Sequence, residues 1–290
     1  MHFKLKKNIK KIVLLAVIFI SAFFIVRGIF VLNSNKKVIE DKSEIKNTEK
    51  GSTSGDQITE KFEAGYFAPI LAFHNVTDSL KKDPYGLTVN TLVFEKKLQD
   101  INEHKYNTLF VSEVAAYLAK GEKIPKDAVA LTFDDGKENF YTNVFPLLKK
   151  YNIKASLYII TGVRSVHYLS ESQIKEIDQS GLVEIGSHTV YHQRMSKLPE
   201  ERQLKELKDS KKYLEKLLGK EITVICYPYG DHSDLTKQLS KQVGYKYGLN
   251  FDKVPVVDSA DMFEIDRVGV FPELNISKYL EKLNIKNHNI

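Results

Sequence analysis

The chain has 290 residues, 42% hydrophobic and 11% aromatic, so it can bury one sizeable core within one or two domains. Its net charge of +6 comes from residues 1–32, which hold six basic residues and no acidic one. The other 37 basic residues equal the 37 acidic residues of the chain, which gives no support for a nucleic-acid partner. The single cysteine, Cys226, excludes an intramolecular disulfide, and its apolar surroundings favour a buried, inert thiol.

Residues 12–32 form an apolar span that only Arg27 interrupts, long enough to cross a hydrocarbon core of roughly 30 Å. The lysines of residues 1–11 predict that this end stays in the cytoplasm and that the rest of the chain lies outside the cell. We therefore expect a single-pass signal anchor in the cell membrane. A cleaved signal peptide, which would leave a secreted protein, is the alternative, because Arg27 limits the clean apolar stretch to residues 12–26.

Residues 33–65 are polar and charged, and include the stretch Gly-Ser-Thr-Ser-Gly-Asp at 51–56. They contain few large apolar side chains, so we expect a flexible linker. A linker of this kind would hold one domain, residues 66–290, away from the membrane and within reach of a wall or surface polymer.

From Tyr66 onward, short apolar runs alternate with longer helical patterns, which is typical of parallel β/α units. The apolar runs predict seven strands, at residues 70–73, 128–133, 155–160, 183–185, 223–227, 247–249 and 267–270. The other segments predict helices at residues 91–104, 112–119, 141–150, 171–179, 199–218, 235–242 and 277–283. In the charged helix around 200–220, the residues expected to face inward are Leu204, Leu207, Tyr213, Leu214 and Leu217. The predicted fold class is α/β, approaching a (β/α) barrel.

The strand at 128–133 ends in two adjacent carboxylates and a glycine, in the motif Thr-Phe-Asp-Asp-Gly at 132–136. Folds of the α/β class keep their chemistry at the carboxyl ends of strands. Neighbouring side chains on an extended segment point to opposite sides, so one of Asp134 and Asp135 can bind a metal while the other handles protons. Taken alone, Asp-Asp-Gly is more often a plain turn.

Two histidines, His188 and His192, lie four residues apart in Ser-His-Thr-Val-Tyr-His at 187–192. On a helical turn they would share one face and could bind a single ion. With the carboxylate of Asp135 they would form a three-ligand site that leaves positions open for water and substrate. The predicted cofactor is a divalent metal ion, with zinc favoured by the ligand types and cobalt or another divalent ion left open.

These two motifs, followed by Tyr-Pro-Tyr-Gly at 227–230, resemble the polysaccharide deacetylase family, also called NodB homology or carbohydrate esterase family 4. The resemblance covers roughly residues 69–283. It implies a distorted barrel of about seven parallel strands, in agreement with the strand prediction.

His74 follows the strand at 70–73 directly, in Leu-Ala-Phe-His-Asn-Val, and would lie on the same rim as Asp134 and His188. Much of the family has a Leu-x-His motif near the C-terminus, whereas this chain has no histidine between His232 and His288. The early His74 resembles instead the subgroup that acts on exopolysaccharide adhesins, in which the order of elements is permuted.

The resemblance implies a role for each motif. Asp134 would act as general base and His74 as general acid, while Asp135, His188 and His192 would bind the metal. A backbone N–H near Tyr229 would help to hold the oxyanion. The groove wall that contacts sugar faces would come from Tyr227, Pro228, Tyr229 and Gly230.

One family feature is missing, because Cys226 and Tyr227 stand where the family has an arginine ahead of its Pro-Tyr-Gly motif. We expect Arg267, at the start of the last strand, to pair with Asp134 instead and keep it ionised. Four further histidines match no motif and are expected at the surface: His104, His167, His232 and His288.

The implied activity is the metal-dependent hydrolysis of acetamide groups on N-acetylglucosamine units of an extracellular polysaccharide, with release of acetate. Early His74 and the Tyr-Pro-Tyr-Gly variant favour poly-β-1,6-N-acetylglucosamine over peptidoglycan. An esterase of O-acetylated, xylan-like polymers is a further alternative, because ester and amide hydrolysis need nearly the same geometry. A non-catalytic glycan-binding protein on the same fold is an alternative from another functional class. Such a protein would tolerate loss of the acidic pair or of the histidines, whereas this chain keeps all of them.

Overall fold

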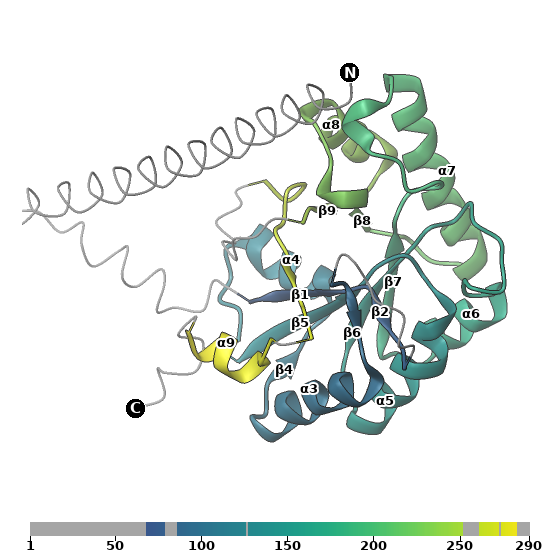
Figure 1. Cartoon of the computed structure of the whole chain (residues 1–290). Helices are drawn as coiled ribbons and strands as arrows, with labels where there is room; N and C mark the ends of the chain where they lie inside the picture. The colour runs from purple at the N-terminus through teal and green to yellow at the C-terminus, as the bar shows by residue number, and fades with distance from the viewer. Residues whose placement is uncertain (1–67, 79–85, 126, 252–260, 273, 283–290) are drawn as a thin grey trace, which may run out of the picture. The chain divides into compact units, whose positions relative to one another are not determined.

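The computed structural model describes residues 68–78, 86–125, 127–251, 261–272 and 274–282 (Figure 1). Within these ranges the strands are β1 (Ile70–Phe73), β2 (Asn75–Val76), β3 (Thr88–Val89), β4 (Asn107–Thr108), β5 (Ala128–Phe133), β6 (Ala155–Ile159), β7 (Val183–Ser187), β8 (Val224–Cys226), β9 (Tyr247–Leu249) and β10 (Val268–Gly269). The α-helices are α3 (Thr91–Glu103), α4 (Val111–Lys120), α5 (Phe145–Tyr151), α6 (Glu171–Gln179), α7 (Glu200–Leu218), α8 (Asp234–Val243) and α9 (Ile276–Lys282).

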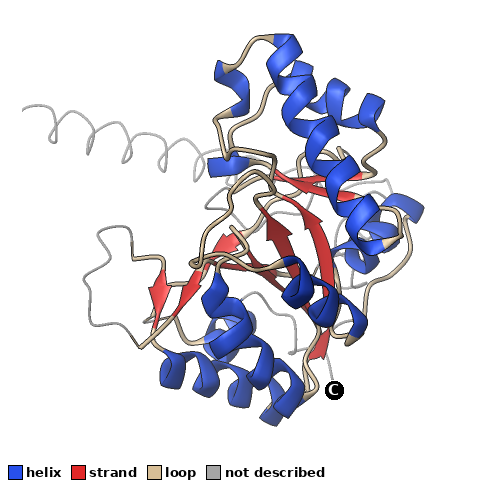
Figure 2. Ribbon diagram, turned by 90° about the vertical axis from the view of Figure 1, so that its right-hand side faces the viewer, coloured by secondary structure: helices blue, strands red, loops and turns tan. Residues whose placement is uncertain are grey.

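The central sheet of the described part has the strand order β10-β1-β5-β6-β7-β8-β9, with β4 paired to β5. Its strand pairs are parallel. The segment that leads into β10 also pairs with β9, since the N–H of Ile265 donates to the carbonyl of Gly248 at 2.9 Å. One continuous stretch of chain therefore joins both edges of the sheet, and the strands curve into a distorted barrel with helices outside it (Figure 2).

The prediction of a parallel α/β barrel of about seven strands is confirmed for this part of the chain. β1 and β5 are buried along their whole length, as expected for parallel strands that are covered on both faces, and this is why they read as continuous apolar runs. The predicted helix at 141–150 begins differently, because Phe140–Val144 form a π-helical turn before α5.

Helix α7 buries four polar side chains as well as apolar ones, and two of the four are charged. Leu207 and Leu214 are buried as expected. Polar side chains share that buried face, namely Gln203, Glu206, Ser210 and Lys211. They make hydrogen bonds to β7 and to neighbouring loops, so this face of α7 makes polar contacts as well as apolar packing.

Among the described residues, no helix is both long enough and apolar enough to cross a membrane. The predicted cytoplasmic segment at 1–11, the anchor at 12–32 and the linker at 33–65 lie outside the described residues.

Candidate metal and catalytic site

Parallel strands bring the chemistry-bearing residues to one rim of the barrel. His74 follows β1, Asp134 and Asp135 follow β5, and His188 follows β7. These strands run in the same direction, so their carboxyl ends lie side by side. The residues that the sequence singled out are therefore neighbours, although more than a hundred positions separate His74 from His192.

Three of them form a compact group of metal-ligating atoms. The Oδ1 atom of Asp135 lies 3.8 Å from Nε2 of His188 and 3.6 Å from Nε2 of His192. The three ligand atoms all lie within 4.8 Å of one another. Two ligands bound at about 2.1 Å in tetrahedral geometry are about 3.4 Å apart, so the spacing fits one shared ion.

The segment that carries both histidines is a loop, so they do not share a face on a helical turn. Thr189 and His192 have left-handed backbone conformations, with φ of 64° and 55°. The N–H of His192 donates to Oγ1 of Thr189 at 3.1 Å. The two imidazoles still meet, with ring centroids 4.7 Å apart, because the loop folds back on itself.

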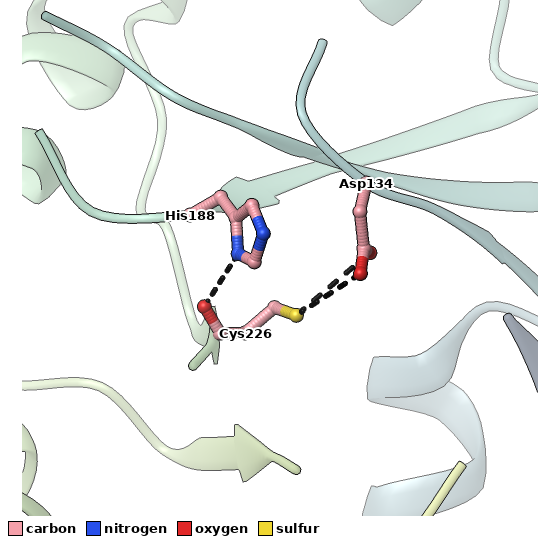
Figure 3. Close-up of side chains that lie close together, drawn as sticks. All are labelled: Asp134, His188 and Cys226. Carbon is pink, nitrogen blue, oxygen red and sulfur yellow. Dashed lines mark hydrogen bonds between the residues drawn. The ribbon is translucent and has the colours of Figure 1, made fainter. Parts of the chain in front are cut away.

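The hydrogen bond of His188 fixes which ring nitrogen is free. Its Nδ1 lies 2.7 Å from the carbonyl oxygen of Cys226, drawn in Figure 3. A carbonyl only accepts, so Nδ1 carries the proton and the lone pair of Nε2 is directed to Asp135. Burial, together with neighbouring His188, lowers the pKa of His192 to about 4, which keeps that ring neutral and able to bind a metal near neutral pH.

Asp134 is held by the arginine that the sequence analysis chose for it. Arg267 donates from Nη1 and Nη2 to the two carboxylate oxygens, each at 2.8 Å. Both side chains are buried, at 3% and 1% exposure. Burial raises the pKa of Asp134, but the guanidinium outweighs burial and the net pKa is lowered, so Asp134 is ionised.

Cys226 offers a second possible ligand group with Asp134 and His188, which Figure 3 shows close together. Its Sγ lies 3.8 Å from both oxygens of Asp134 and 3.0 Å from Nη2 of Arg267. A metal there would have to displace the buried guanidinium from Asp134. Burial also raises the pKa of the Cys226 thiol, so the inert thiol that the sequence predicted agrees with the structure, and the group of Asp135, His188 and His192 is the better candidate for a metal site.

His74 completes the rim beside Asp134. Its Nε2 lies 3.6 Å from Oδ2 of Asp134, and its ring lies edge-on to Phe251. Burial lowers the pKa of His74, while the charges of Asp134 and Asp135 oppose this shift. The neutral imidazole is thus favoured at neutral pH in the free protein.

Lys137 is a contact that the sequence analysis missed. Its Nζ lies 2.9 Å from Oδ2 of Asp135, whereas Oδ1 of Asp135 is the oxygen measured against the two histidines. Burial raises the pKa of Asp135, but His188 and Lys137 outweigh it and the net pKa is lowered. The residue follows the Asp-Asp-Gly motif directly, and only the fold shows that its side chain turns back.

Two residues of the Tyr-Pro-Tyr-Gly segment are buried, so the predicted wall is wrong for them. Tyr227 is fully buried, donates to Ser240 and stacks on His232, and Pro228 is also buried, so these two cannot contact a sugar. Tyr229 is 57% exposed and its ring lies 4.6 Å from that of His192. A Cβ on Gly230 would lie 2.6 Å from the backbone nitrogen of Phe251, so this position requires glycine.

This turn leaves one backbone N–H group as a candidate donor to the oxyanion. The N–H groups of Gly230 and Asp231 already donate to the carbonyls of Tyr227 and Pro228. The N–H of Tyr229 stays the predicted donor.

Two of the histidines expected at the surface, His104 and His167, are exposed. His232 is not, with 12% exposure and Nδ1 3.0 Å from the carbonyl of Gly230, so that prediction is wrong. His288 lies outside the described residues.

Comparison with solved structures finds the same fold. The deacetylase PplD of Streptococcus pyogenes, solved in complex with acetate, superposes with a TM-score of 0.69 and 31% identity, covering 74% of this chain and 97% of that one. IcaB from Ammonifex degensii superposes with a TM-score of 0.63 and 25% identity, again covering 74% and 97%.

Sequence comparison gives the same family. The polysaccharide deacetylase family model matches residues 121–248. The chain is 30% identical over 212 residues to YxkH of Bacillus subtilis, a protein whose name describes it as a polysaccharide deacetylase. The match covers 73% of this chain and 74% of that protein. It is 32% identical over 204 residues to the poly-β-1,6-N-acetyl-D-glucosamine N-deacetylase of Staphylococcus aureus, across 66% and 70%. The chain belongs to the polysaccharide deacetylase family and is a deacetylase enzyme.

Proposed function

We propose that the protein hydrolyses the acetamide groups of N-acetylglucosamine units in an extracellular polysaccharide, and that poly-β-1,6-N-acetylglucosamine is its substrate. The observation that carries this proposal is the meeting, on one barrel rim, of a three-ligand group and a separate ionised carboxylate. The name of the S. aureus relative supports the choice of polymer. The extracellular location is part of the proposal and rests on the anchor predicted at residues 12–32.

The donors present fit a divalent ion held by Asp135, His188 and His192. One carboxylate oxygen and two imidazole nitrogens suit zinc, and cobalt or another divalent ion fits the same set. When bound, the ion would polarise the acetamide carbonyl and increase the acidity of water.

Asp134 is the base in this proposal. It is ionised and lies next to the metal group without belonging to the three ligands. Each carboxylate oxygen has lone pairs beyond the one that Arg267 uses, so Asp134 can still accept the proton of the attacking water. The N–H of Tyr229 would donate to the oxyanion that forms.

His74 delivers a proton to the departing amine. Since its pKa is lowered, the ring starts neutral at neutral pH, and the proton it delivers would be the one that Asp134 takes from water. Nε2 of His74 lies 3.6 Å from Oδ2 of Asp134, so the proton would move only a short distance between the two side chains. The products would be acetate and a glucosamine unit, which is cationic near neutral pH.

The substrate is tested by incubating the purified protein with poly-β-1,6-N-acetylglucosamine and, separately, with peptidoglycan. Free amine is measured with a chelator present and again after a divalent metal is restored. We expect amine from the first polymer, only with metal. Amine from peptidoglycan alone would move the assignment to that polymer, and acetate from acetylated xylan alone would make the protein an esterase. No product from any polymer with metal restored would overturn the hydrolase proposal.

The acid role of His74 predicts different losses on two kinds of substrate. We expect His74→Ala to slow amide hydrolysis by about 10²–10⁴-fold, because an amine leaves poorly without a proton. Hydrolysis of 4-nitrophenyl acetate should fall far less, since nitrophenolate leaves unprotonated. Both rates are measured on one preparation, with His104→Ala as the control at an exposed histidine. An equal loss on both substrates would contradict the acid role.

A further inference from the structure

The loop after β7 has a backbone that needs support from outside. Thr189 and His192 adopt left-handed conformations that residues with a side chain rarely adopt. Such conformations persist where surrounding contacts fix them. The two candidate ligands, His188 and His192, lie at the two ends of this strained stretch. Contacts that fix the residues between them therefore also set the distance between the two imidazoles.

A buried carboxylate holds the N–H groups in the middle of this stretch, while the N–H groups of Thr161 and Gly162 donate to the carbonyls of Thr189 and Val190 at 3.1 and 2.8 Å. Glu206, on α7, is 2% exposed, and its Oε2 accepts from the N–H of Val190 at 2.9 Å and of Tyr191 at 2.8 Å. These are consecutive backbone groups between His188 and His192. A side chain without an acceptor would remove this partner from both N–H groups at a part-buried site, and the unpaired groups would cost free energy.

Neighbouring residues of α7 hold the same loop further along. Ser210 bonds to Ser187 at 2.7 Å, before the first histidine, and Gln203 donates to the carbonyl of Leu198 at 2.9 Å. Residues 203, 206 and 210 share one face of the helix, because they are three and four positions apart. The buried polar face of α7 thus forms hydrogen bonds with this segment before His188, between the two histidines and after His192.

The two histidines do not depend on these contacts equally. The ring of His188 is buried and has its own bond to the carbonyl of Cys226. The side chain of His192 is 24% exposed, and its ring contacts the exposed Tyr229. The position of His192 therefore depends more strongly on the loop backbone.

We propose that Glu206 is a positioning residue that places His192 for metal binding through the N–H groups of Val190 and Tyr191. This inference rests on the metal site of the proposed function. Glu206 does not touch substrate or metal in this scheme, and its effect passes through the loop. The second coordination sphere of metal sites acts in the same way, by orienting the residues that bind.

Three variants of the full chain test the role of Glu206. Glu206→Gln keeps a side-chain oxygen that can accept from both N–H groups, whereas Glu206→Leu has a similar size and no acceptor. Glu201→Leu, at an exposed position of the same helix, is the matched control. Zinc affinity is measured by competition with a chromogenic chelator, the cobalt site by its visible spectrum, and the backbone by hydrogen exchange at Val190 and Tyr191.

We expect Glu206→Leu to weaken zinc binding by about 10- to 100-fold, to alter the cobalt spectrum and to speed exchange at the two N–H groups. Glu206→Gln should recover the parent affinity and spectrum, and Glu201→Leu should match the parent. A folded Glu206→Leu with parent affinity would overturn the proposal, as would Glu206→Gln losing as much as Glu206→Leu.

If Glu206→Leu does not fold, Glu206→Asp takes its place, because the shorter side chain cannot reach both N–H groups. Its affinity should then fall below that of Glu206→Gln, and equal affinities would overturn the proposal. A parent protein that binds neither zinc nor cobalt would overturn the metal site and, with it, this inference. Hydrogen exchange in that case would still show whether Glu206 fixes the loop.

Discussion

Asp134→Asn is expected to lower the rate of deacetylation by about 10²–10⁴-fold while the protein still binds its metal. The carboxamide has nearly the shape of the carboxylate, but it cannot take a proton from water near neutral pH. One carboxamide oxygen can still accept from Arg267, so the side chain should stay in place. Metal affinity should change little, because the proposed ligand group is Asp135 with the two histidines. The measurements are the rate of amine release and zinc affinity on the same sample.

The adjacent carboxylate supplies the matched control for this experiment. Asp135→Asn changes the same chemical group one residue away, and it should weaken zinc binding as well as activity, since Oδ1 of Asp135 faces both histidines. The two roles are therefore separated by affinity rather than by rate. An Asp134→Asn protein with full activity, or one that loses zinc as readily as Asp135→Asn, would contradict the assigned base.

Much of the barrel could be predicted because its strands are buried on both faces. A strand such as β5 must then be apolar throughout, and its burial over Ala128–Phe133 matches the predicted run residue for residue. The two-residue strands β2, β3 and β4 were not predicted, since a pair of residues carries no periodicity. The π-helical turn before α5 also has no pattern of its own in the sequence.

The candidate site was predictable where it depends on strand ends and not where it depends on loops. Asp134 and His188 follow strands, so a parallel sheet brings them together. The conformation of the histidine loop depends on Glu206, fourteen positions after His192 and on another element. Tyr227 shows the same limit, because only the packing of α8 and His232 decides that it is buried.

The sequence of α7 does distinguish Glu206, but a search for apolar positions alone overlooks it. Its position falls among the leucines of the inner face, directly before buried Leu207. A carboxylate on the buried side of a helix needs donors, and consecutive backbone N–H groups of a loop are a common source. The sequence could therefore have marked Glu206 as a residue with a partner, although not which partner.

Arg267→Met is expected to destabilise the metal-free protein by about 3–5 kcal/mol near neutral pH, because it leaves a buried carboxylate without its cation. Asp134 would lose both bonds from the guanidinium. Arg267 also donates to the carbonyl of Asn250 at 3.0 Å, so a further buried acceptor loses its partner. The free energy of unfolding is measured with urea, in the presence of chelator so that metal binding does not contribute.

Two comparisons separate the buried charge from ordinary loss of packing. The double variant Arg267→Met with Asp134→Asn should be more stable than Arg267→Met alone, because it removes the uncompensated charge. Lys150→Met, which breaks the exposed pair with Glu95, should leave the urea midpoint unchanged. A double variant less stable than the single one would show that the uncompensated charge of Asp134 is not the main cause of the lost stability.

The pH dependence of the stability lost in Arg267→Met, called the deficit below, gives the sharpest test of whether an unpaired charge causes the loss. In the parent, Arg267 holds the pKa of Asp134 below the ordinary 3.8, so this stabilisation is full above that value and is lost as pH falls through the lowered pKa. In Arg267→Met, burial acts without the guanidinium and raises the pKa above 3.8. The folded variant then binds the proton more tightly than the unfolded chain, and its stability falls as pH rises through the raised pKa. The deficit should therefore be smaller at pH about 4 than at pH about 7, and an equal deficit at both would mean that Asp134 carries no unpaired charge in the variant.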